Sequence, residues 1–461
     1  MPSSAAILVL DVGKTLSKLS RWSANGVLFD KVIRPNARYE VDGLVRLDAG
    51  GIGAWVRETL QNYASKGPVR AIIPVGHGAG VAAIRNSELA FAPLDYEQPI
   101  PEAVMTDYRL KRDTFGDTGS PALPLGLNIG SQLHWIETVT PGALDGVALV
   151  PWAQYWSWFL SGVATSEVTS LGCHSDLWNP AAGDFSDLAR SRGWANRFAP
   201  MAKAGDVVGK LKPEFGFGDT VDVHCGIHDS NAALLAARGF VEIEQEEVTV
   251  FSTGTWFIGM RCPKVPFDLR NLAEARDCLV NVDAHGAAVP SARFMGGREI
   301  EEVICIDTRR VDIVPDQPAL LAAVAAVLKA GSMLLPTLVP DCGPFPNGCG
   351  HWVAEPADWV QRRAAACLYA ALVANVSLDL IGAENILLVE GRFSEAEVFV
   401  RALASLRRGT RVYTSNAHND VSLGALRLID PSIRPSGKLK RVEPLTEDLT
   451  NYAAQWIRLA V

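Results

Sequence analysis

One pattern occurs twice in this sequence, and it restricts the folds that the chain can adopt. Residues 5–10 form an unbroken apolar run, which is typical of a strand buried on both faces, and residues 247–251 are also predicted to form a strand. A polar turn containing glycine and threonine follows each strand, and then a second strand-like segment at residues 16–22 or 256–260. Helix-like and strand-like segments alternate after each of these hairpins. We therefore predict a duplicated α/β lobe, because a repeated pattern is most simply folded as a repeated unit.

The remaining elements and the chain length agree with two lobes. A chain of 461 residues is too long for one compact core, and we place the domains at residues 1–240 and 241–461. Asn25-Gly26 is a strong hairpin signal. Ser394 with Glu397 predicts a capping box that opens a helix. Further strands are expected at residues 27–32, 69–75, 221–224, 386–389 and 411–413, and helices at 52–64, 231–237, 358–381 and 422–428.

Charge and composition argue against several classes of protein. The formal net charge is −8 and there is no long Lys/Arg run, so we expect no nucleic-acid partner. No apolar run approaches the roughly 20 residues that cross a bilayer, so we expect no membrane partner. The eight cysteines are scattered, which favours a reducing cytoplasm. Cys342, Cys349 and His351 lack the tight spacing of a zinc site and are better explained by a Gly/Pro loop.

The first polar turn has the residues of a phosphate-binding loop. Glycine lets the backbone approach a ligand, hydroxyl and N–H groups donate to oxygens, and lysine neutralises phosphate charge. Asp11, at the end of the strand, is a candidate to hold a magnesium ion through water. A decorated hairpin without a ligand explains the turn equally well. The candidate contacts after Asp11 are Gly13, Lys14, Thr15, Ser17 and Lys18.

The second polar turn repeats this chemistry without the charge. Thr253, Gly254 and Thr255 place hydroxyl groups around one glycine. Taken alone, this turn is explained more simply as a polar hairpin. Two such hairpins on equivalent lobes, facing each other across a cleft, would hold a polyphosphate from both sides.

Asp229 is the candidate catalytic base. It lies between a predicted strand and a helix of small residues, where the helix dipole favours an ionised carboxylate. His228 beside it is a candidate to hydrogen-bond a substrate hydroxyl. The alternative is that Asp229 only caps the helix, as carboxylates often do.

Further candidates for the substrate side come from a glycine-rich loop and an aromatic helix. Glycines flank His77, including Gly78, and leave its ring accessible for either a sugar contact or a structural role. Trp152 and Gln132 combine an aromatic ring and an amide, which suits carbohydrate recognition, although a core-facing helix also explains the tryptophan.

Together, three of these segments resemble the FGGY carbohydrate kinase family, in the family's order and over nearly the whole chain. His228 directly before Asp229 is most similar to the branch that contains rhamnulokinase and related ketose kinases. The matching motifs are Asp11-x-Gly13-x-Thr15-x-x-Lys18, Gly226-x-x-Asp229-x-x-Ala232-Ala233 and Ser252-Thr253-Gly254-Thr255-Trp256.

The resemblance implies two actin-like (ribonuclease H-like) lobes with an ATP and sugar cleft between them. It implies a cytoplasmic, ATP- and Mg²⁺-dependent kinase of a ketose or deoxyketose, such as L-rhamnulose or L-fuculose. Asp229 would take the proton from the attacking sugar hydroxyl, the two hairpins would hold the β- and γ-phosphates, and Asp11 would lie near the magnesium ion. The family's adenosine loop corresponds to Gly391, Arg392 and Ser394.

The chain departs from the family pattern in three places. Only Gly391 remains of a run of glycines, and Lys14 replaces a hydroxyl residue, where it would form a phosphate contact or a salt bridge. The loop at residues 76–80 matches neither the common xylulose kinase nor the glycerol kinase form. A kinase of a polyol or an aldose, and a non-catalytic ATP-binding protein of the actin or chaperone type, therefore stay open as alternatives, as do a monomer and a homodimer.

Overall fold

The computed structural model describes residues 5–218, 220–415 and 421–461. The chain forms two compact units. The first comprises Met1–Gly239, Val280–Ala288 and Asn419–Pro435, and the second comprises Phe240–Leu279, Val289–His418 and Ser436–Val461. The main boundary between the units lies beside residue 240. Two later segments of the chain return to the first unit, so the two domains are not two continuous halves of the sequence.

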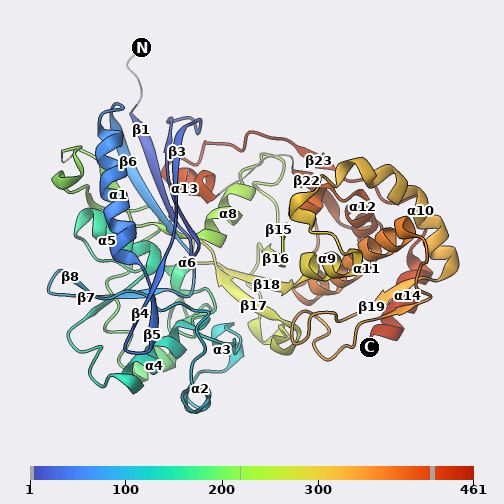
Figure 1. Ribbon diagram of the computed structural model, residues 1–461, viewed down its shortest axis with the longest axis horizontal. Helices are drawn as coiled ribbons and strands as arrows, with labels where there is room; N and C mark the ends of the chain where they lie inside the picture. The colour runs from blue at the N-terminus through green and yellow to red at the C-terminus, as the bar shows by residue number, and fades with distance from the viewer. Residues whose placement is uncertain (1–4, 219, 416–420) are drawn as a thin grey trace. The chain divides into compact units, whose positions relative to one another are not determined.

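The first unit is built on a mixed sheet in the order β12-β13-β6-β1-β2-β3, with β14 also paired to β6 (Figure 1). Its central pair, β1 and β6, is parallel, whereas β1, β2 and β3 form an antiparallel meander. The strands are β1 (Ala6–Val12), β2 (Leu16–Trp22), β3 (Leu28–Pro35), β6 (Val69–Gly76), β12 (Val207–Lys210), β13 (Asp222–His224) and β14 (Ile227–His228).

Helices cover both faces of this sheet. Every side chain of β1 is buried, because Leu8 and Leu10 pack on one face and Ile7 and Val9 on the other. Helices α1 (Ala49–Ala64) and α5 (Trp152–Ser161) cover the first face, and α8 (Asp229–Ala237) and α13 (Val421–Ile429) cover the second (Figure 1).

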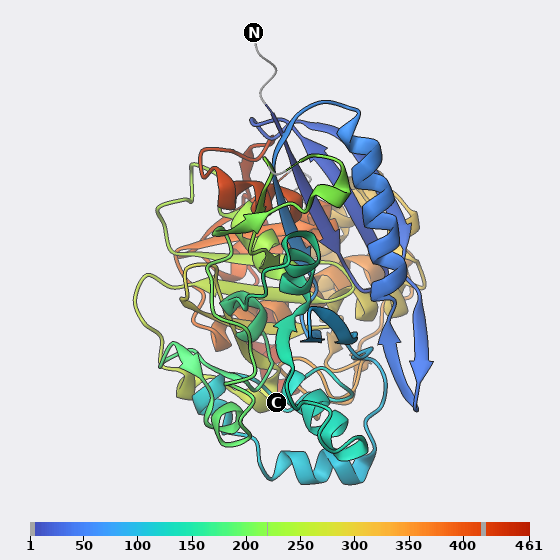
Figure 2. The same ribbon diagram turned by 90° about the vertical axis from the view of Figure 1, so that its left-hand side faces the viewer.

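A smaller cluster continues the first unit and appears in the lower part of Figure 2. It packs the three-stranded sheet β8-β7-β9 against helices. Its elements, with those around it, are β4 (Arg38–Val41), β5 (Leu44–Leu47), β7 (Val81–Arg85), β8 (Glu88–Phe91), β9 (Ala148–Pro151), β10 (Trp178–Asn179), β11 (Asp184–Phe185), α2 (Glu102–Arg109), α3 (Phe115–Thr118), α4 (Ile129–Val139), α6 (Val168–Leu171) and α7 (Asp187–Ser191).

The second unit repeats the topology with the sheet order β17-β18-β16-β15-β21-β22-β23, in which the end of β17 lies in the segment Val280–Ala288 that belongs to the first unit. As in the first unit, an antiparallel hairpin adjoins a parallel pair, here β15 and β21. The elements are β15 (Val248–Thr253), β16 (Phe257–Cys262), β17 (Cys278–Val282), β18 (Ala288–Phe294), β19 (Met333–Leu335), β20 (His351–Val353), β21 (Ile386–Gly391), β22 (Arg411–Ser415), β23 (Leu439–Arg441), α9 (Gly296–Ile304), α10 (Gln317–Ala330), α11 (Trp359–Leu380), α12 (Glu397–Leu406) and α14 (Thr450–Ala460).

The duplicated α/β lobe and its elements are confirmed, and most predicted ends fall within three residues of the observed ones. The capping box is wrong. The hydroxyl of Ser394 donates to the carbonyl of Gly391 at 2.7 Å, and α12 begins after Ala396 without a side-chain cap. The N–H of Glu397 instead donates to Gln317 at 2.8 Å, so a distant side chain replaces the local cap.

Helix α11 is the one element among the described residues with the length and composition of a membrane span. Of its most apolar 18-residue window, 72% is buried inside the protein. It packs against α9, α10 and α12. We therefore describe it as the core helix of the second unit.

Candidate active site

Three predicted segments meet at one edge of the first unit's sheet. Strands β1, β6 and β14 run parallel, and their register pairs Val12 with Gly76 and Gly76 with His228. The carboxyl ends of parallel strands lie at the same edge of a sheet, which is the usual place for a ligand. The turn after β1, the loop after β6 and Asp229 after β14 are therefore brought together.

Internal hydrogen bonds hold the turn after β1. The N–H of Gly13 donates to the carbonyl of Leu16 at 3.0 Å, and the amide of Asn36 donates to the carbonyl of Gly13 at 2.7 Å. The buried hydroxyl of Ser17 donates to Asn36 at 2.8 Å, so Ser17 supports the turn from beneath. Thr15 is exposed at its tip.

Both lysines of this turn are paired with carboxylates. Nζ of Lys18 lies 2.9 Å from Oδ2 of Asp11 on the facing strand. Nζ of Lys14 lies 2.9 Å from Oδ1 of Asp95 and also contacts Glu97. Of the two roles considered for Lys14, the structure shows the salt bridge. The pairing also means that the turn presents less free positive charge than its sequence suggests.

His77 is buried in the loop after β6, and one of its ring nitrogens has no hydrogen-bond partner among the described residues. Its Nδ1 lies 2.6 Å from the carbonyl of Gly78, which makes Nδ1 the protonated nitrogen of the neutral ring. Burial lowers the pKa of His77, so the ring is neutral near pH 7. Nε2 is then an acceptor, and it has no hydrogen-bond partner among the described residues. The ring lies between Tyr96 and Trp152, with centroid distances of 5.5 and 6.2 Å.

Two further polar atoms beside this loop are also buried without a hydrogen-bond partner among the described residues. Nε2 of Gln132 donates to the carbonyls of Ala79 (2.7 Å) and Gly126 (2.5 Å). Its Oε1 is buried without a partner in the described part of the chain, and so is Nε1 of Trp152. The indole ring itself belongs to the core, since it is 1% exposed and stacks on Tyr155 at 5.3 Å.

Asp229 is held through one carboxylate oxygen. Oδ1 accepts from the N–H of Ser230 at 2.6 Å and lies 3.1 Å from Nε2 of His228. Oδ2 has no partner described in residues 5–218, 220–415 or 421–461. Burial raises the pKa of Asp229, but the charge and hydrogen bond of His228 outweigh it, so the net pKa is below the ordinary value. Asp229 is therefore an ionised carboxylate with one oxygen available.

The helix-cap alternative for Asp229 does not describe its position. Asp229 is the first residue of α8, and the N-cap is His228, which has no capping side-chain bond. The preceding turn requires glycine, because Gly226 has φ +89° and an added Cβ would come within 2.6 Å of the carbonyl of Pro74. Oxygens of this turn accept from α5: Gln154 donates to the carbonyl of Gly226 at 3.0 Å.

In the second unit, β15 and β21 bring the second hairpin and the adenosine-loop candidates together. Their register pairs Thr253 with Gly391. The hydroxyl of Thr253 donates to the carbonyl of Glu390 at 2.5 Å and accepts from the N–H of Phe393 at 3.1 Å. It therefore ties the hairpin to the loop. Gly254 and Thr255 are exposed at the hairpin tip.

Gly391 is the one adenosine-loop position that only glycine fits. Its φ is +84°, and an added Cβ would lie 2.3 Å from the carbonyl of Thr253. Arg392 donates to the carbonyl of Val311 and so fastens the loop to a neighbouring segment. Ser394, which is half-buried, follows them.

The comparisons with known proteins decide the family. A crystal structure of a carbohydrate kinase from Novosphingobium aromaticivorans is 62% identical in sequence, covers 98% of this chain and 100% of its own, and superposes with a TM-score of 0.96. The family model "Carbohydrate kinase FGGY, C-terminal domain" matches residues 245–436. The chain belongs to the FGGY carbohydrate kinase family.

More distant structures show the same fold. A xylulose kinase from Rhodospirillum rubrum has a TM-score of 0.80 at 14% identity, with 98% of each chain covered. A glycerol kinase from Plasmodium falciparum, solved with ADP, has a TM-score of 0.79 at 11% identity, with 99% of this chain and 98% of that chain covered. No curated protein sequence compared with the chain matches it. The actin-like, two-lobed fold is thus confirmed, and the enzyme is a phosphotransferase of a family that uses ATP.

The sequence did not predict several residues that surround this kinase's candidate base. Sγ of Cys173 lies 3.8 Å from Nε2 of His228, and Nδ2 of Asn231 lies 3.3 Å from its Nδ1. Thr169 accepts from the backbone N–H of His228 at 3.0 Å, and Glu167 accepts from Thr169 at 2.5 Å. Of these residues, Asn231 could have been found from the sequence, because it stands three residues after His228, a spacing at which side chains meet on a helix. The others come from a separate segment.

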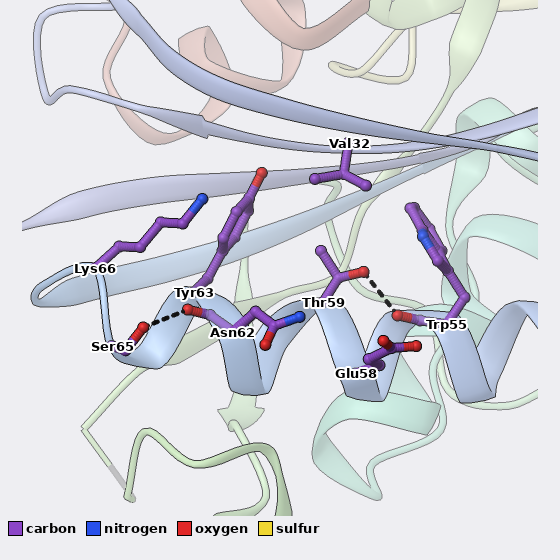
Figure 3. A pocket seen from close by; sticks show the side chains of 8 residues that line it. All are labelled: Val32, Trp55, Glu58, Thr59, Asn62, Tyr63, Ser65 and Lys66. Atoms are coloured by element: carbon purple, nitrogen blue, oxygen red, sulfur yellow. Dashed lines mark hydrogen bonds between the residues drawn. The ribbon is translucent and has the colours of Figure 1, made fainter.

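A surface pocket in the first unit lies away from these residues. It has a volume of about 480 Å³ and lies along α1, beneath β3 (Figure 3). Its polar groups are used locally: Thr59 donates to the carbonyl of Trp55, and Ser65 to that of Asn62, both at 2.8 Å. We assign it no part in the reaction. Its lining residues are Val32, Trp55, Glu58, Thr59, Asn62, Tyr63, Ser65 and Lys66.

Proposed function

We propose that this kinase transfers the γ-phosphate of ATP to a hydroxyl group of a neutral ketose or deoxyketose, of the L-rhamnulose or L-fuculose type, with Asp229 as general base. The observation that carries the proposal is the carboxylate of Asp229. It is ionised, fixed through Oδ1 and left with Oδ2 available, beside a loop of buried polar atoms without partners. A base in this state accepts the proton of an attacking hydroxyl as the bond to phosphorus forms.

The buried atoms support a sugar as the acceptor. Nε2 of His77 and Oε1 of Gln132 are acceptors, and Nε1 of Trp152 is a donor. A buried polar atom without a partner costs about 1–3 kcal/mol, so hydroxyl groups of a bound sugar would recover this energy. We propose these three residues as sugar contacts, together with the backbone of Gly78.

The charge around the site supports a neutral sugar over a sugar acid. The lysines of the first turn, Lys14 and Lys18, are both engaged by carboxylates. An anionic substrate would be expected to require a charge partner such as an arginine fork.

On the nucleotide side, we propose that the two hairpins contact the phosphates of ATP. Backbone N–H groups and exposed hydroxyls would make these contacts, and Ser17 and Thr253 would hold the turns. Lys14 would act indirectly, by fixing the first turn through Asp95. The proposed phosphate and adenosine contacts are Gly13, Thr15, Lys18, Gly254, Thr255, Gly391, Arg392 and Ser394.

Magnesium would enter this site with the nucleotide. No group of three His, Cys, Asp or Glu side chains among the described residues is arranged to hold a metal ion. Oδ2 of Asp11 already accepts from Lys18, so Asp11 suits an outer contact to a hydrated ion better than direct ligation. Mg²⁺ commonly retains several waters and takes further ligands from phosphates.

A coupled assay of ATP consumption, run with magnesium against ketoses, deoxyketoses, aldoses, polyols and sugar acids, tests this function. We expect one neutral ketose or deoxyketose to stand out in kcat/KM. A sugar acid as the best substrate would contradict the choice of a neutral sugar, which rests on the pairing of Lys14 and Lys18 with carboxylates. An aldose or polyol as the best substrate would refute the ketose assignment but not the kinase. The absence of turnover with ATP still bound would contradict the proposed reaction.

A further inference from the structure

We propose that Cys173 and His228 form a pair that positions the carboxylate of Asp229, so that the thiol group of Cys173 affects phosphoryl transfer without touching the substrate. The inference rests on the proposed function, because it assigns a role relative to the proposed base. It also gives His228 a different part from the sugar contact expected from the sequence.

The geometry places one imidazole nitrogen between two acidic groups. Nε2 of His228 is 3.1 Å from Oδ1 of Asp229 and 3.8 Å from Sγ of Cys173. The ring is 4% exposed and the thiol 3% exposed, so neither is well hydrated. The single hydrogen on Nε2 lies within reach of both groups: the ring forms an ion pair with Oδ1 of Asp229 and a hydrogen bond with Sγ of Cys173. The imidazole therefore acts on the base through Oδ1, and it has no second hydrogen on Nε2 for a sugar hydroxyl.

Two further groups contact His228. Its backbone N–H donates to Thr169 at 3.0 Å. The side-chain amide of Asn231 faces Nδ1 at 3.3 Å, and the oxygen of that amide, which has no other partner among the described residues, is the atom that accepts from a protonated Nδ1. Gly78 is required beside it, because an added Cβ would lie 2.9 Å from Nε2 of His228 and 3.3 Å from Sγ of Cys173. The glycine loop of β6 thus leaves space for the thiol–imidazole contact.

The charges in this cluster support one another. Burial alone would raise the pKa of Cys173, but the imidazoles of His174 and His228 lower it to about 5. Burial alone would lower the pKa of His228, but Cys173 and Asp229 raise it well above its ordinary value. Near pH 7 Cys173 is therefore a thiolate, His228 an imidazolium and Asp229 a carboxylate. The thiolate keeps the imidazole protonated, and the protonated imidazole keeps Asp229 in place.

Two more titratable groups face this cluster. Glu167 is buried, with its pKa raised to about 7, and it interacts with His228. His77 is kept neutral by burial and interacts with both His228 and Asp229. Neither replaces the thiolate as the partner of the imidazolium ring, because Cys173 is the larger influence on the pKa of His228 after burial.

The test compares Cys173→Ala and Cys173→Ser with wild type, with Cys367→Ala as a control for loss of a buried thiol in the second unit. We expect kcat to fall about tenfold in both Cys173 variants, the loss of one charge-assisted hydrogen bond, while the KM for sugar changes less. We also expect the pKa of His228, read from its Cε1–H resonance, to fall when the thiolate is lost. The basic limb of the kcat–pH profile should move to lower pH by the same amount.

His228→Gln gives the second arm. Without the imidazolium ring, burial dominates, so the pKa of Asp229 rises and the acid limb of kcat moves to higher pH.

An unchanged pH profile and an unchanged His228 titration in both Cys173 variants would overturn the inference, as would a rise in sugar KM with normal kcat. If Asp229→Asn still turns over, the proposed base fails. If that variant is inactive and the Cys173 profiles match wild type, the positioning pair alone fails. The serine variant retains the test if the alanine variant does not fold.

Discussion

Asp229 uses one carboxylate oxygen for contacts within the protein and leaves the other available. The N–H of Ser230 and the imidazole of His228 both act on Oδ1, and both favour the ionised form. A raised pKa would hold the proton before the sugar arrives, and a carboxylate without these contacts would rotate away from the sugar. The arrangement at this residue therefore suits a base that is ionised and oriented before substrate binds.

A substitution at His77 tests the proposed sugar contacts. His77→Ala removes the buried acceptor Nε2 and should raise the KM for sugar by about tenfold, the value of one hydrogen bond in a buried site. The KM for ATP should change little. His351→Ala, at an exposed histidine, is the matched control. Steady-state kinetics with both substrates varied would check this, and an equal rise in both KM values would indicate a general disturbance of the fold.

At the scale of elements, Thr253 holds the second hairpin to the loop after β21. Thr253→Val removes a donor and an acceptor at once, and the loop containing Gly391 would lose its attachment. We expect the KM for ATP to rise by about tenfold and more than that for sugar. Thr249→Val is a control on the same strand, since Thr249 is buried and has no side-chain hydrogen bond described. A larger effect on sugar KM would place this hairpin away from the nucleotide.

Helix α8, which begins with Asp229, depends on close packing against α13. An added Cβ at Gly424 would lie 1.8 Å from the carbonyl of Ala232. Gly424→Ala should therefore force the helices apart and reduce the free energy of unfolding by about 1–3 kcal/mol. Chemical denaturation measures this loss. Gly409→Ala is the control, because its Cβ would meet nothing within 4 Å, and equal stability of the two variants would contradict the close packing.

The elements that could be predicted from the sequence are those with local causes. The hairpins follow from apolar runs and from turn residues such as Asn25 and Gly26, and Asp229 follows from its place between a strand and a helix. The contacts that could not be predicted are long-range. A salt bridge was one of the two roles expected for Lys14, but its partner Asp95 has no local signal. The acceptor of the Glu397 N–H, Gln317, is equally distant in the sequence. Cys173 likewise reaches His228 only through tertiary folding.

At the scale of the whole molecule, each unit carries a separate part of the candidate machinery. The sugar and base candidates lie in the first unit, and the second hairpin with Gly391 lies in the second. The first unit also contains Glu167, which is fully buried. Stability of this unit should therefore depend on the protonation of one carboxyl group.

Burial raises the pKa of Glu167 from 4.5 to about 7. A raised pKa in the folded state means that the folded protein binds the proton more tightly, so this stabilisation is complete below pH 4.5 and is lost as the pH rises through about 7. Relative to Glu167→Gln, wild type should lose stability between pH 5 and pH 7.5, by about 1–3 kcal/mol. Urea unfolding at the two pH values measures this, and a difference that does not change with pH would show that Glu167 is ionised throughout.

The central claim is that Asp229 accepts the proton in phosphoryl transfer to a sugar, and Asp229→Asn tests it most directly once a substrate is known. The substitution keeps the size of the side chain and removes the basic oxygen. We predict that ATP and sugar still bind, by calorimetry, while kcat falls by about 10²–10⁴-fold, the usual contribution of a general base. Near-normal kcat in a variant that binds both substrates would contradict the account.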